Sequence, residues 1–341
     1  MSEEATQSAW PIFRGNSAPH DGITRRPDPP PWRRYEGKAT VDETLDARAA
    51  RQPARSQERG STFYFKKDDP VIQQINTALF LRRPLLVTGK PGTGKSTLAH
   101  AVAYELKLGP VLEWPITSRS ALAEALYRYD AIGRLQEAQI PDNKNVDIGR
   151  YIRLGPLGTA LLPGNYPRVL LIDEIDKSDI DLPNDLLHVF EEGGYEIPEL
   201  TRLQEQTKPV NVRLHESEDT APIRRGRVQC SEFPFVVITS NGERELPPAF
   251  LRRCIPVDIP EPTPDDLEFI VNNHFRKLDE RSRAAILPLI ERFEKRRKLG
   301  DLATDQLLNA VFLAAQGVDI SADRQDLEAT VYRPLTQFRG G

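Results

Sequence analysis

The sequence predicts an α/β fold in which a parallel β-sheet is flanked by helices and followed by a C-terminal helical lid. Three apolar runs of strand length, at residues 84–87, 169–172 and 235–238, each end in polar residues that could line a site. Segments with helical periodicity and capping residues separate these runs, which is typical of strands joined by helical crossovers. Beyond residue 260 the sequence becomes wholly helical, and this change predicts the lid.

A glycine-rich turn follows the first apolar run. The stretch Gly89-Lys90-Pro91-Gly92-Thr93-Gly94-Lys95-Ser96 fits the pattern G-x-x-x-x-G-K-S/T, with a strand-like segment before it and a helical segment after it. A chance match in a chain of this length has odds on the order of one in a hundred from average residue usage. Backbone N–H groups in such a turn can surround a phosphate, and the helix N-terminus favours its charge. We expect Lys95 to reach the β- and γ-phosphates of a nucleoside triphosphate and the Ser96 hydroxyl to bind Mg²⁺. The predicted phosphate-binding residues are Gly89, Pro91, Gly92, Thr93, Gly94, Lys95, Ser96 and Thr97.

Polar side chains follow the other two apolar runs. Asp173 and Glu174 come directly after the run at 169–172, 77 and 78 residues beyond Ser96. The carboxyl ends of parallel strands collect ligands, so we expect Asp173 to hold Mg²⁺ and Glu174 to polarise the attacking water. Asn241 follows the run at 235–238 and could contact the γ-phosphate or the water, or could simply form a turn.

Composition and charge describe an ordinary soluble protein. Of the 341 residues, 39% are hydrophobic and 28% are charged, which allows about two domains. The net charge of −4 argues against nucleic acid as the main partner, and the two cysteines, Cys230 and Cys254, are too few for a disulfide framework. The N-terminus lacks a signal-peptide pattern, and no apolar run approaches the roughly 20 residues that span a bilayer. We therefore expect a cytoplasmic protein that does not associate with membranes.

The chain divides by composition into a tail, a core and a lid. Residues 1–61 are rich in Pro and Arg and poor in aliphatic residues, which predicts a disordered tail. A Pro-Trp-rich island at 27–35 could be a docking peptide, or only part of a solvated tail. Residues 62–260 form the predicted nucleotide-binding domain, with inserts at 118–165 and 195–233, and residues 261–341 form the lid. Within the second insert, the alternating segment 210–214 is expected to pair with 227–229 as a β-hairpin.

Together these features resemble the AAA+ ATPases, and the resemblance implies that the nucleotide is ATP. The segment Leu246-Pro247-Pro248-Ala249-Phe250-Leu251-Arg252-Arg253-Cys254 is similar to the one that carries the family's arginine finger, a residue that reaches a neighbouring subunit's site. The pattern of apolar residues places Arg253 at the finger position, with Arg252 as the second choice. Asp69, Val71 and Ile72 resemble the family's base-binding linker.

Within AAA+ the chain most resembles the MoxR-like group, because both inserts have counterparts there. Tyr151-Ile152-Arg153-Leu154-Gly155-Pro156-Leu157 is similar to the end of the group's first insert, and the resemblance covers about residues 63–330. It implies a ring, expected to be a homo-hexamer, that hydrolyses ATP and remodels a partner protein in a chaperone-like way. Partners with von Willebrand factor A-type domains are typical of the group.

One departure from the family pattern keeps other functions open. The lid segment that usually carries a basic residue near the γ-phosphate reads Asp301-Leu302-Ala303-Thr304-Asp305-Gln306-Leu307, without arginine or lysine. This mildly favours a slow, nucleotide-gated regulator of a bacterial conflict system. Basic clusters at 223–227 and 292–298 leave a nucleic-acid motor as a further alternative.

Overall fold

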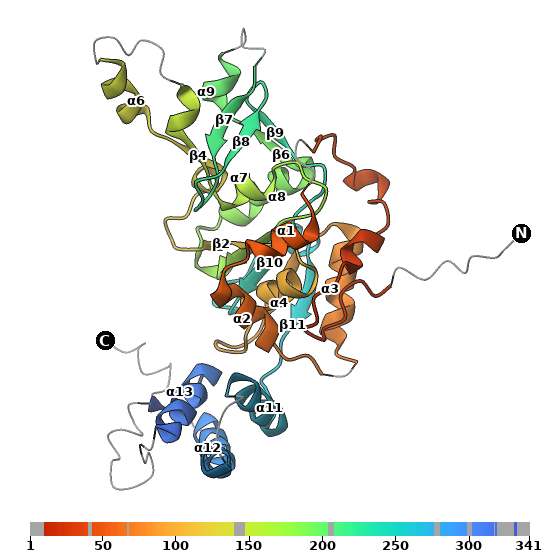
Figure 1. The fold of residues 1–341 in the computed structure, drawn as a ribbon, viewed down its shortest axis with the longest axis vertical. Coiled ribbons are helices and arrows are strands. Elements are labelled where there is room, and N and C mark those ends of the chain that lie inside the picture. The colour runs from red at the N-terminus through yellow and green to blue at the C-terminus, as the bar shows by residue number, and fades with distance from the viewer. Residues whose placement is uncertain are drawn as a thin grey trace, which may run out of the picture.

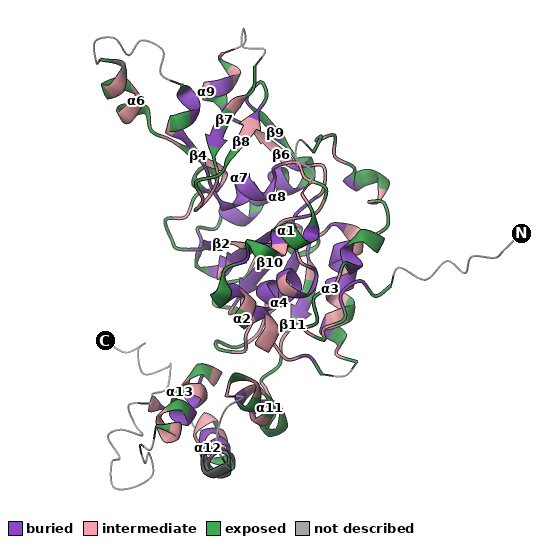
Figure 2. Ribbon diagram, in the orientation of Figure 1, coloured by how far each residue is buried: buried purple, intermediate pink, exposed green. Residues whose placement is uncertain are grey.

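The computed structural model describes residues 10–39, 43–66, 68–139, 147–203, 208–275, 280–298, 302–316, 318 and 331–332. They form an α/β core with a second sheet at one end and a helical lid at the other (Figure 1). Figure 2 shows buried residues concentrated in the strands and helices of the core, while α6 (Ala131–Ala138) projects with exposed and half-buried residues.

A five-stranded sheet forms the centre of the core, with every neighbouring pair parallel. Its spatial order is β11-β1-β10-β5-β2. The three predicted strands are confirmed, and β2 and β11 complete the sheet. The bounds are β1 Leu85–Thr88, β2 Val111–Pro115, β5 Val169–Asp173, β10 Phe235–Ser240 and β11 Ile255–Asp258.

Each face of the central sheet buries its own apolar cluster because successive side chains point to opposite faces. Leu85 and Val87 pack with helices α3 (Pro70–Leu81) and α4 (Thr97–Glu105). Leu86, from the same strand, packs on the other face with helices α7 (Pro156–Ala160) and α8 (Leu182–Glu192). The sheet is therefore held from both sides, which fixes the ends of its strands.

The helix boundaries follow capping signals in the sequence. The Asp69 side chain accepts a hydrogen bond from the Val71 N–H at 3.0 Å, and Pro70 is the first residue of α3, a position that suits proline. Gly193 ends α8 with φ = 63°, a left-handed conformation that favours glycine. Thr263 and Asp266 form a capping box at the start of the first lid helix.

The two predicted inserts share one additional sheet with the order β3-β4-β7-β8. Its strands are β3 Tyr127–Tyr129, β4 Ile152–Leu154, β7 Val210–Arg213 and β8 Thr220–Ile223. The expected pairing of 210–214 with 227–229 is wrong, because β7 pairs with β8, and β9 (Arg227–Gln229) pairs with β6 (Gly194–Glu196). A tight turn, closed by a 3.0 Å hydrogen bond from the Leu214 N–H to the Asp219 carbonyl, selects the nearer partner. The remaining short helices are α5 Leu122–Leu126, α9 Pro198–Thr201 and α10 Pro248–Leu251, with 3₁₀ turns at Ile148–Tyr151 and Ile175–Lys177.

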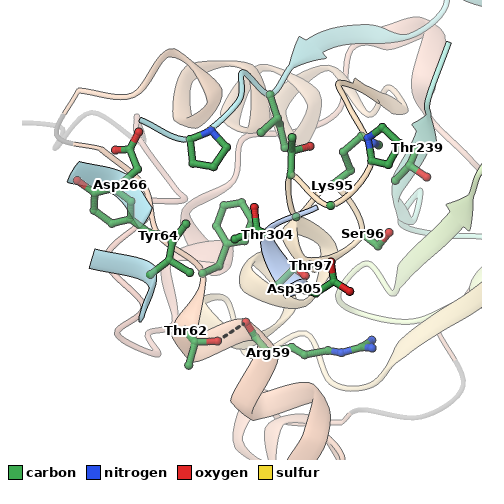
Figure 3. A pocket seen from close by; sticks show the side chains of 18 of the residues that line it. Arg59, Thr62, Tyr64, Lys95, Ser96, Thr97, Thr239, Asp266, Thr304 and Asp305 are labelled. Carbon is green, nitrogen blue, oxygen red and sulfur yellow. Dashed lines mark hydrogen bonds between the residues drawn. The ribbon is translucent and has the colours of Figure 1, made fainter. Parts of the chain in front are cut away.

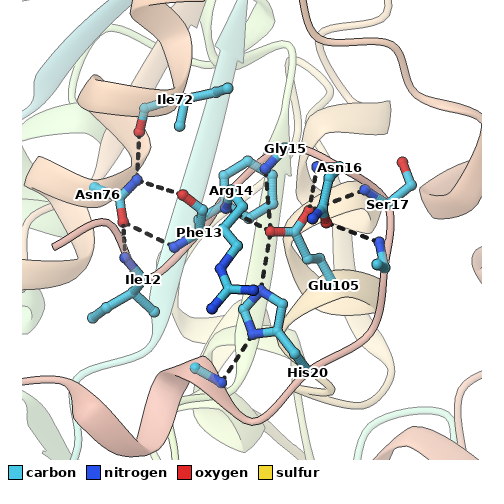
Figure 4. A network of polar contacts seen from close by, with 12 residues as sticks. Ile12, Phe13, Arg14, Gly15, Asn16, Ser17, His20, Ile72, Asn76 and Glu105 are labelled. Carbon is cyan, nitrogen blue, oxygen red and sulfur yellow. Dashed lines mark hydrogen bonds and ion pairs between the residues drawn. The ribbon is translucent and has the colours of Figure 1, made fainter. Parts of the chain in front are cut away.

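The described part of the N-terminal segment packs on the core, so the prediction of a disordered tail is wrong for residues 10–39 and 43–61. Ile12 and Phe13 are fully buried. The Asn76 side chain in α3 accepts hydrogen bonds from the N–H groups of both residues, at 2.7 and 2.9 Å, and donates to the Phe13 carbonyl at 2.8 Å (Figure 4). Residues 1–9 lie outside the described part.

A second core side chain, Glu105, also holds this segment. Its carboxylate is 1% exposed and accepts hydrogen bonds from four successive backbone N–H groups (Figure 4). The donors and distances are Arg14 at 2.6 Å, Gly15 at 3.1 Å, Asn16 at 2.9 Å and Ser17 at 3.1 Å. The N-terminal segment is therefore ordered with few aliphatic residues of its own, because its backbone forms hydrogen bonds with buried polar side chains of the core.

The rest of the N-terminal segment continues along the core to the first apolar residues of the predicted domain. It contains 3₁₀ turns at Gly22–Arg25 and Pro31–Arg33 and the helices α1 (Leu45–Ala50) and α2 (Ala54–Thr62). In the Pro-Trp-rich island, Arg33 and Tyr35 donate hydrogen bonds to the Phe190 carbonyl at 2.6 and 3.2 Å, whereas Trp32 remains 78% exposed. The island is thus attached to the chain's own core through Arg33 and Tyr35.

The lid contains α11 (Pro264–His274), α12 (Glu280–Arg297) and α13 (Thr304–Ala315), around a core that includes Leu267 and Phe293. Apolar periodicity also predicts a lid helix near 322–333, and of this range only residues 331 and 332 belong to the described part of the chain. In the part of the chain that the structure describes, no helix has the length and apolar character needed to cross a membrane.

Candidate nucleotide site

The predicted phosphate loop opens into a cavity of about 710 Å³ between the core and the lid (Figure 3). It lies where β1, β5 and β10 end, because parallel strands deliver their last residues to one edge of the sheet. Of the predicted site residues, this cavity is lined by Pro91, Gly92, Thr93, Gly94, Lys95, Ser96, Thr97, Asp173, Glu174 and Asn241. Gly89 and Arg253 do not line the cavity.

Positive backbone φ angles shape the loop. Gly89, Gly92 and Gly94 have φ of 143°, 77° and 89°, which side chains rarely permit. A Cβ at Gly92 would lie 2.4 Å from the Ala303 Cβ, so glycine here also allows the lid to approach the loop. Lys95 is 7% exposed and donates from Nζ to the carbonyls of Gly89 and Lys90, both at 2.8 Å. Burial lowers the pKa of Lys95, while nearby carboxylates act in the opposite direction.

Asp173 lies beside two hydroxyl groups. Its Oδ1 accepts hydrogen bonds from Ser96 Oγ and Thr239 Oγ1, each at 2.6 Å. The Ser96–Asp173 pair supplies the hydroxyl and carboxylate oxygens that suit Mg²⁺, which usually takes its other ligands from phosphates and water. The described residues contain no cluster of three or more His, Cys, Asp or Glu that could hold a metal ion.

Glu174 follows Asp173 in a left-handed backbone conformation, with φ = 62° and ψ = 53°. Such a conformation costs a non-glycine residue about 1–3 kcal/mol of strain. Its N–H donates to Thr239 Oγ1 at 2.8 Å. Its carboxylate accepts from Asn241 Nδ2 at 3.2 Å and from Lys177 Nζ, and this second contact raises the pKa of Lys177. The turn thus aims the carboxylate at the cavity and holds it from two sides.

Asp176 supports this arrangement and was not among the predicted site residues. It is 3% exposed, and its Oδ2 accepts hydrogen bonds from the backbone N–H groups of Asn241 and Glu243, both at 3.0 Å. The buried carboxylate therefore joins the end of β5 to the end of β10. In the sequence, Asp176 cannot be distinguished from an acidic turn residue that is exposed to solvent. Its contacts with the end of β10 become apparent only when β5 and β10 are seen to be neighbouring strands.

The opposite end of the cavity has the apolar surface that a nucleobase needs. Phe63, Tyr64 and Val71 approach it from the core side, and Ile270 and Leu308 approach it from the lid. Of the predicted base-binding segment, Asp69 and Val71 line the cavity, and Ile72 does not. The Tyr64 ring packs on Phe269 with centroids 4.0 Å apart, and Lys66 forms a 2.7 Å ion pair with Asp266. These contacts connect the entry segment to the lid.

Arg59 is a cavity residue that the sequence analysis missed, because it belongs to the supposed tail (Figure 3). Helix α2 crosses α4 at Gly60, where a Cβ would lie 2.5 Å from the His100 carbonyl oxygen, and this close approach brings Arg59 to the cavity. Its Nη1 lies 3.4 Å from His100 Nε2 and 3.8 Å from Glu113 Oε1. The residues of lid helix α13 that line the cavity, in contrast to Arg59, carry no positive charge: they are Thr304, Asp305 and Leu308.

Arg253 does not line its own chain's cavity. Its side chain is 38% exposed, is paired with Glu191, and donates from Nη1 to the Ala249 carbonyl at 3.1 Å. Arg252 beside it is exposed. Either arginine could act at a phosphate only in the site of another chain.

A known protein family covers the region of the chain that carries this site. The family model for the AAA domain (dynein-related subfamily) matches residues 84–254, which run from the first strand of the sheet to the end of the segment that contains Arg253. No curated protein matches the chain. One similar solved structure is the FIGL-1 AAA domain in complex with ADP, which is 19% identical over 76% of each chain with a TM-score of 0.34.

Proposed function

We propose, from the premise that this chain belongs to the AAA domain family (dynein-related subfamily), that it binds ATP with Mg²⁺ and hydrolyses it to ADP and phosphate. The observation that carries the proposal is the 2.6 Å contact between Ser96 Oγ and Asp173 Oδ1 in the cavity that Lys95 and Glu174 also line. A phosphate-binding turn, a Mg²⁺ ligand pair and a candidate base thus share one space.

Each group has a distinct role in this proposal. The loop N–H groups and Lys95 bind the phosphates, and Ser96 and Asp173 hold Mg²⁺. Glu174 accepts a proton from the attacking water, and Asn241 holds the Glu174 carboxylate in place. The aromatic end of the cavity receives the base, and we infer that this base is adenine.

Titration calorimetry with ATP and with GTP tests the proposed binding. Lys95→Ala should abolish ATP binding, because the cation that faces the phosphates is lost. Lys90→Ala is the matched control, since Lys90 belongs to the same loop, is paired with Glu261 at 2.8 Å and does not line the cavity. Normal ATP affinity in Lys95→Ala would contradict the proposed site, and stronger binding of GTP would contradict the proposed base.

We further propose that the chain assembles into a MoxR-like ring, with six subunits, that remodels a partner protein. Support comes from Arg253, which is partly exposed and outside its own cavity, so that a neighbouring chain's site would give it a function. The insert sheet projects from the end of the core opposite the lid and offers a surface for a client or for a von Willebrand factor A-type partner (Figure 1).

Hydrolysis measured against protein concentration, with and without DNA, tests the assembly. A ring with shared sites predicts specific activity that rises steeply with concentration. Activity that stays constant down to concentrations where the protein is monomeric would contradict it. Strong stimulation by DNA would favour a nucleic-acid motor instead.

A nucleotide-gated regulator remains the second candidate, because the described lid residues that line the cavity include no arginine or lysine. Slow turnover that increases only when a partner binds would favour that function over a continuously working remodeller.

A further inference from the structure

A second cavity, of about 780 Å³, lies apart from the nucleotide site. Three segments enclose it: α1 with the residues just before it, the turn at 162–168, and the turn of the β7–β8 hairpin at 214–222. The N-terminal segment, the core and the insert sheet therefore all meet at this one space.

Three arginines line this second cavity, and they have few partners. Arg48 is 7% exposed at its side chain, and its nearest carboxylate is Glu43, with Nε 3.7 Å from Oε2. Arg51, at the more exposed rim, contacts Glu43 and lies 3.5 Å from Asp219. Arg168 donates from Nη1 to the Leu162 carbonyl at 2.7 Å and has no carboxylate within ion-pair distance among the described residues. The lining as a whole holds three guanidinium groups and the carboxylates of Glu43, Glu218 and Asp219, but none of these carboxylates is paired with Arg168.

The positive charges of Arg48 and Arg168 are only partly compensated within this lining. Burial lowers the pKa of both Arg48 and Arg168 to about 10, and repulsion from Arg48 contributes to the shift at Arg168. A buried cation destabilises the fold unless it is paired and hydrogen-bonded. Each guanidinium also has five N–H donors, and a single carbonyl and one distant carboxylate use few of them.

A phosphate group is the ligand that matches these donors. Its oxygens can accept hydrogen bonds from two planar guanidinium groups at once, which a single carboxylate does less well. Thr44, Asn165 and Tyr166 add polar groups to the wall, and the cavity is larger than one phosphate ion. We propose that this cavity binds a phosphate group, carried on a small organic molecule or free, between Arg48 and Arg168.

The position of Arg168 suggests how a ligand in the second cavity could affect the nucleotide site. Its carbonyl accepts a 2.8 Å hydrogen bond from the Phe235 N–H, and the strand that it precedes ends at Asp173. A ligand in the second cavity would therefore stabilise the base of the strand that carries the proposed Mg²⁺ ligand.

Calorimetry on the full chain with Lys95→Ala tests the inference, because this background removes the phosphate-binding lysine of the nucleotide site. The probes are ribose 5-phosphate, inorganic phosphate and ribose, at constant ionic strength. We expect saturable binding of ribose 5-phosphate at one site and none of ribose. Inorganic phosphate that binds as tightly as the ester would identify the free ion as the occupant, and weaker binding would identify an ester.

Substitutions of the cavity arginines test whether ribose 5-phosphate binds in the second cavity. Arg168→Gln should weaken this binding by at least about tenfold, since a charged donor is lost, and Arg168→Lys should retain more affinity. Arg213→Gln is the matched control, because Arg213 is exposed on β7 and does not line the cavity. If Arg168→Gln does not fold, as judged by circular dichroism, Arg48→Gln replaces it.

The absence of saturable binding, or equal affinity in the Arg168→Gln and control variants, would overturn the inference. This result is independent of the proposed ATPase, which fails instead if Lys95→Ala still binds ATP.

Discussion

Asn241 donates a hydrogen bond from its side-chain Nδ2 to Oε1 of the Glu174 carboxylate, with 3.2 Å between the two atoms. The two residues lie at the ends of neighbouring parallel strands, β10 and β5, so the register of the sheet sets their separation. The carboxylate proposed to activate water is thereby oriented by a neutral donor, which does not compete with it for a proton.

Glu174→Gln should stop turnover and spare binding. The amide is the same size as the carboxylate but cannot accept a proton from water, so we expect kcat to fall about 10²–10⁴-fold. Calorimetry should give an ATP affinity close to that of the unchanged protein. A variant that hydrolyses ATP at the normal rate would exclude Glu174 as the base.

Arg253→Ala should reduce hydrolysis about 10³-fold or more, because the charge at the γ-phosphate of a neighbouring site is lost. Binding should be unaffected, since Arg253 does not line its own cavity. Arg252→Ala is the control and should keep most of the activity.

Mixing two inactive variants tests whether sites are shared. A subunit with Arg253→Ala keeps Glu174, and a neighbour with Glu174→Gln keeps Arg253, so the mixture should regain part of the activity that neither variant has alone. A mixture that stays inactive, with stable assembly shown by sedimentation, would exclude a finger acting between chains.

Arg59→Gln should weaken ATP binding by about tenfold, since a cationic donor that lines the cavity is lost. The effect should be smaller for adenosine, because a guanidinium interacts with phosphates. Arg55→Gln is the matched control, one turn earlier on α2, where the side chain is exposed and outside the cavity. Equal losses in the two variants would mean that only the general charge of α2 matters.

Cys230 and Cys254 should resist alkylation in the folded protein. Burial raises the pKa of each thiol to about 12, and the residues are 0% and 5% exposed. At pH 8 the thiolate fraction should be about a thousandfold lower than for a thiol with the ordinary value of 9.0. Mass spectrometry after iodoacetamide treatment should show labelling only in denaturant, and rapid labelling without it would contradict the burial.

The sequence could predict the central sheet and most of the nucleotide site because their signals are local. The glycine-rich loop, Asp173 and Asn241 each follow an apolar run directly, and parallel strands bring such ends together. The hairpin was mispredicted because 227–229 and 220–223 are both short segments within reach of 210–213, and pattern alone does not choose between them.

The N-terminal segment could not be predicted for a different reason. Its order depends on Asn76 and Glu105, which lie some 63 to 91 residues away in the chain, and hydrogen bonds to backbone amides leave no pattern of side chains. Arg59 was missed with it, since nothing in a segment without periodicity indicates that one arginine reaches a cavity.

The four backbone N–H groups bound to Glu105 also limit how far the N-terminus can be truncated. A fragment that begins at residue 63 would keep the whole span of the family match and every proposed Mg²⁺ ligand. It would nevertheless lack the donors for Glu105 and Asn76, and each buried polar group left unpaired destabilises by about 1–3 kcal/mol. It would also bare the apolar surface of α3 that Ile12 and Phe13 cover. Expression of a core trimmed in this way should therefore yield insoluble material, whereas a fragment that starts at Trp10 keeps the contacts of residues 12–17 with Asn76 and Glu105 and should remain folded.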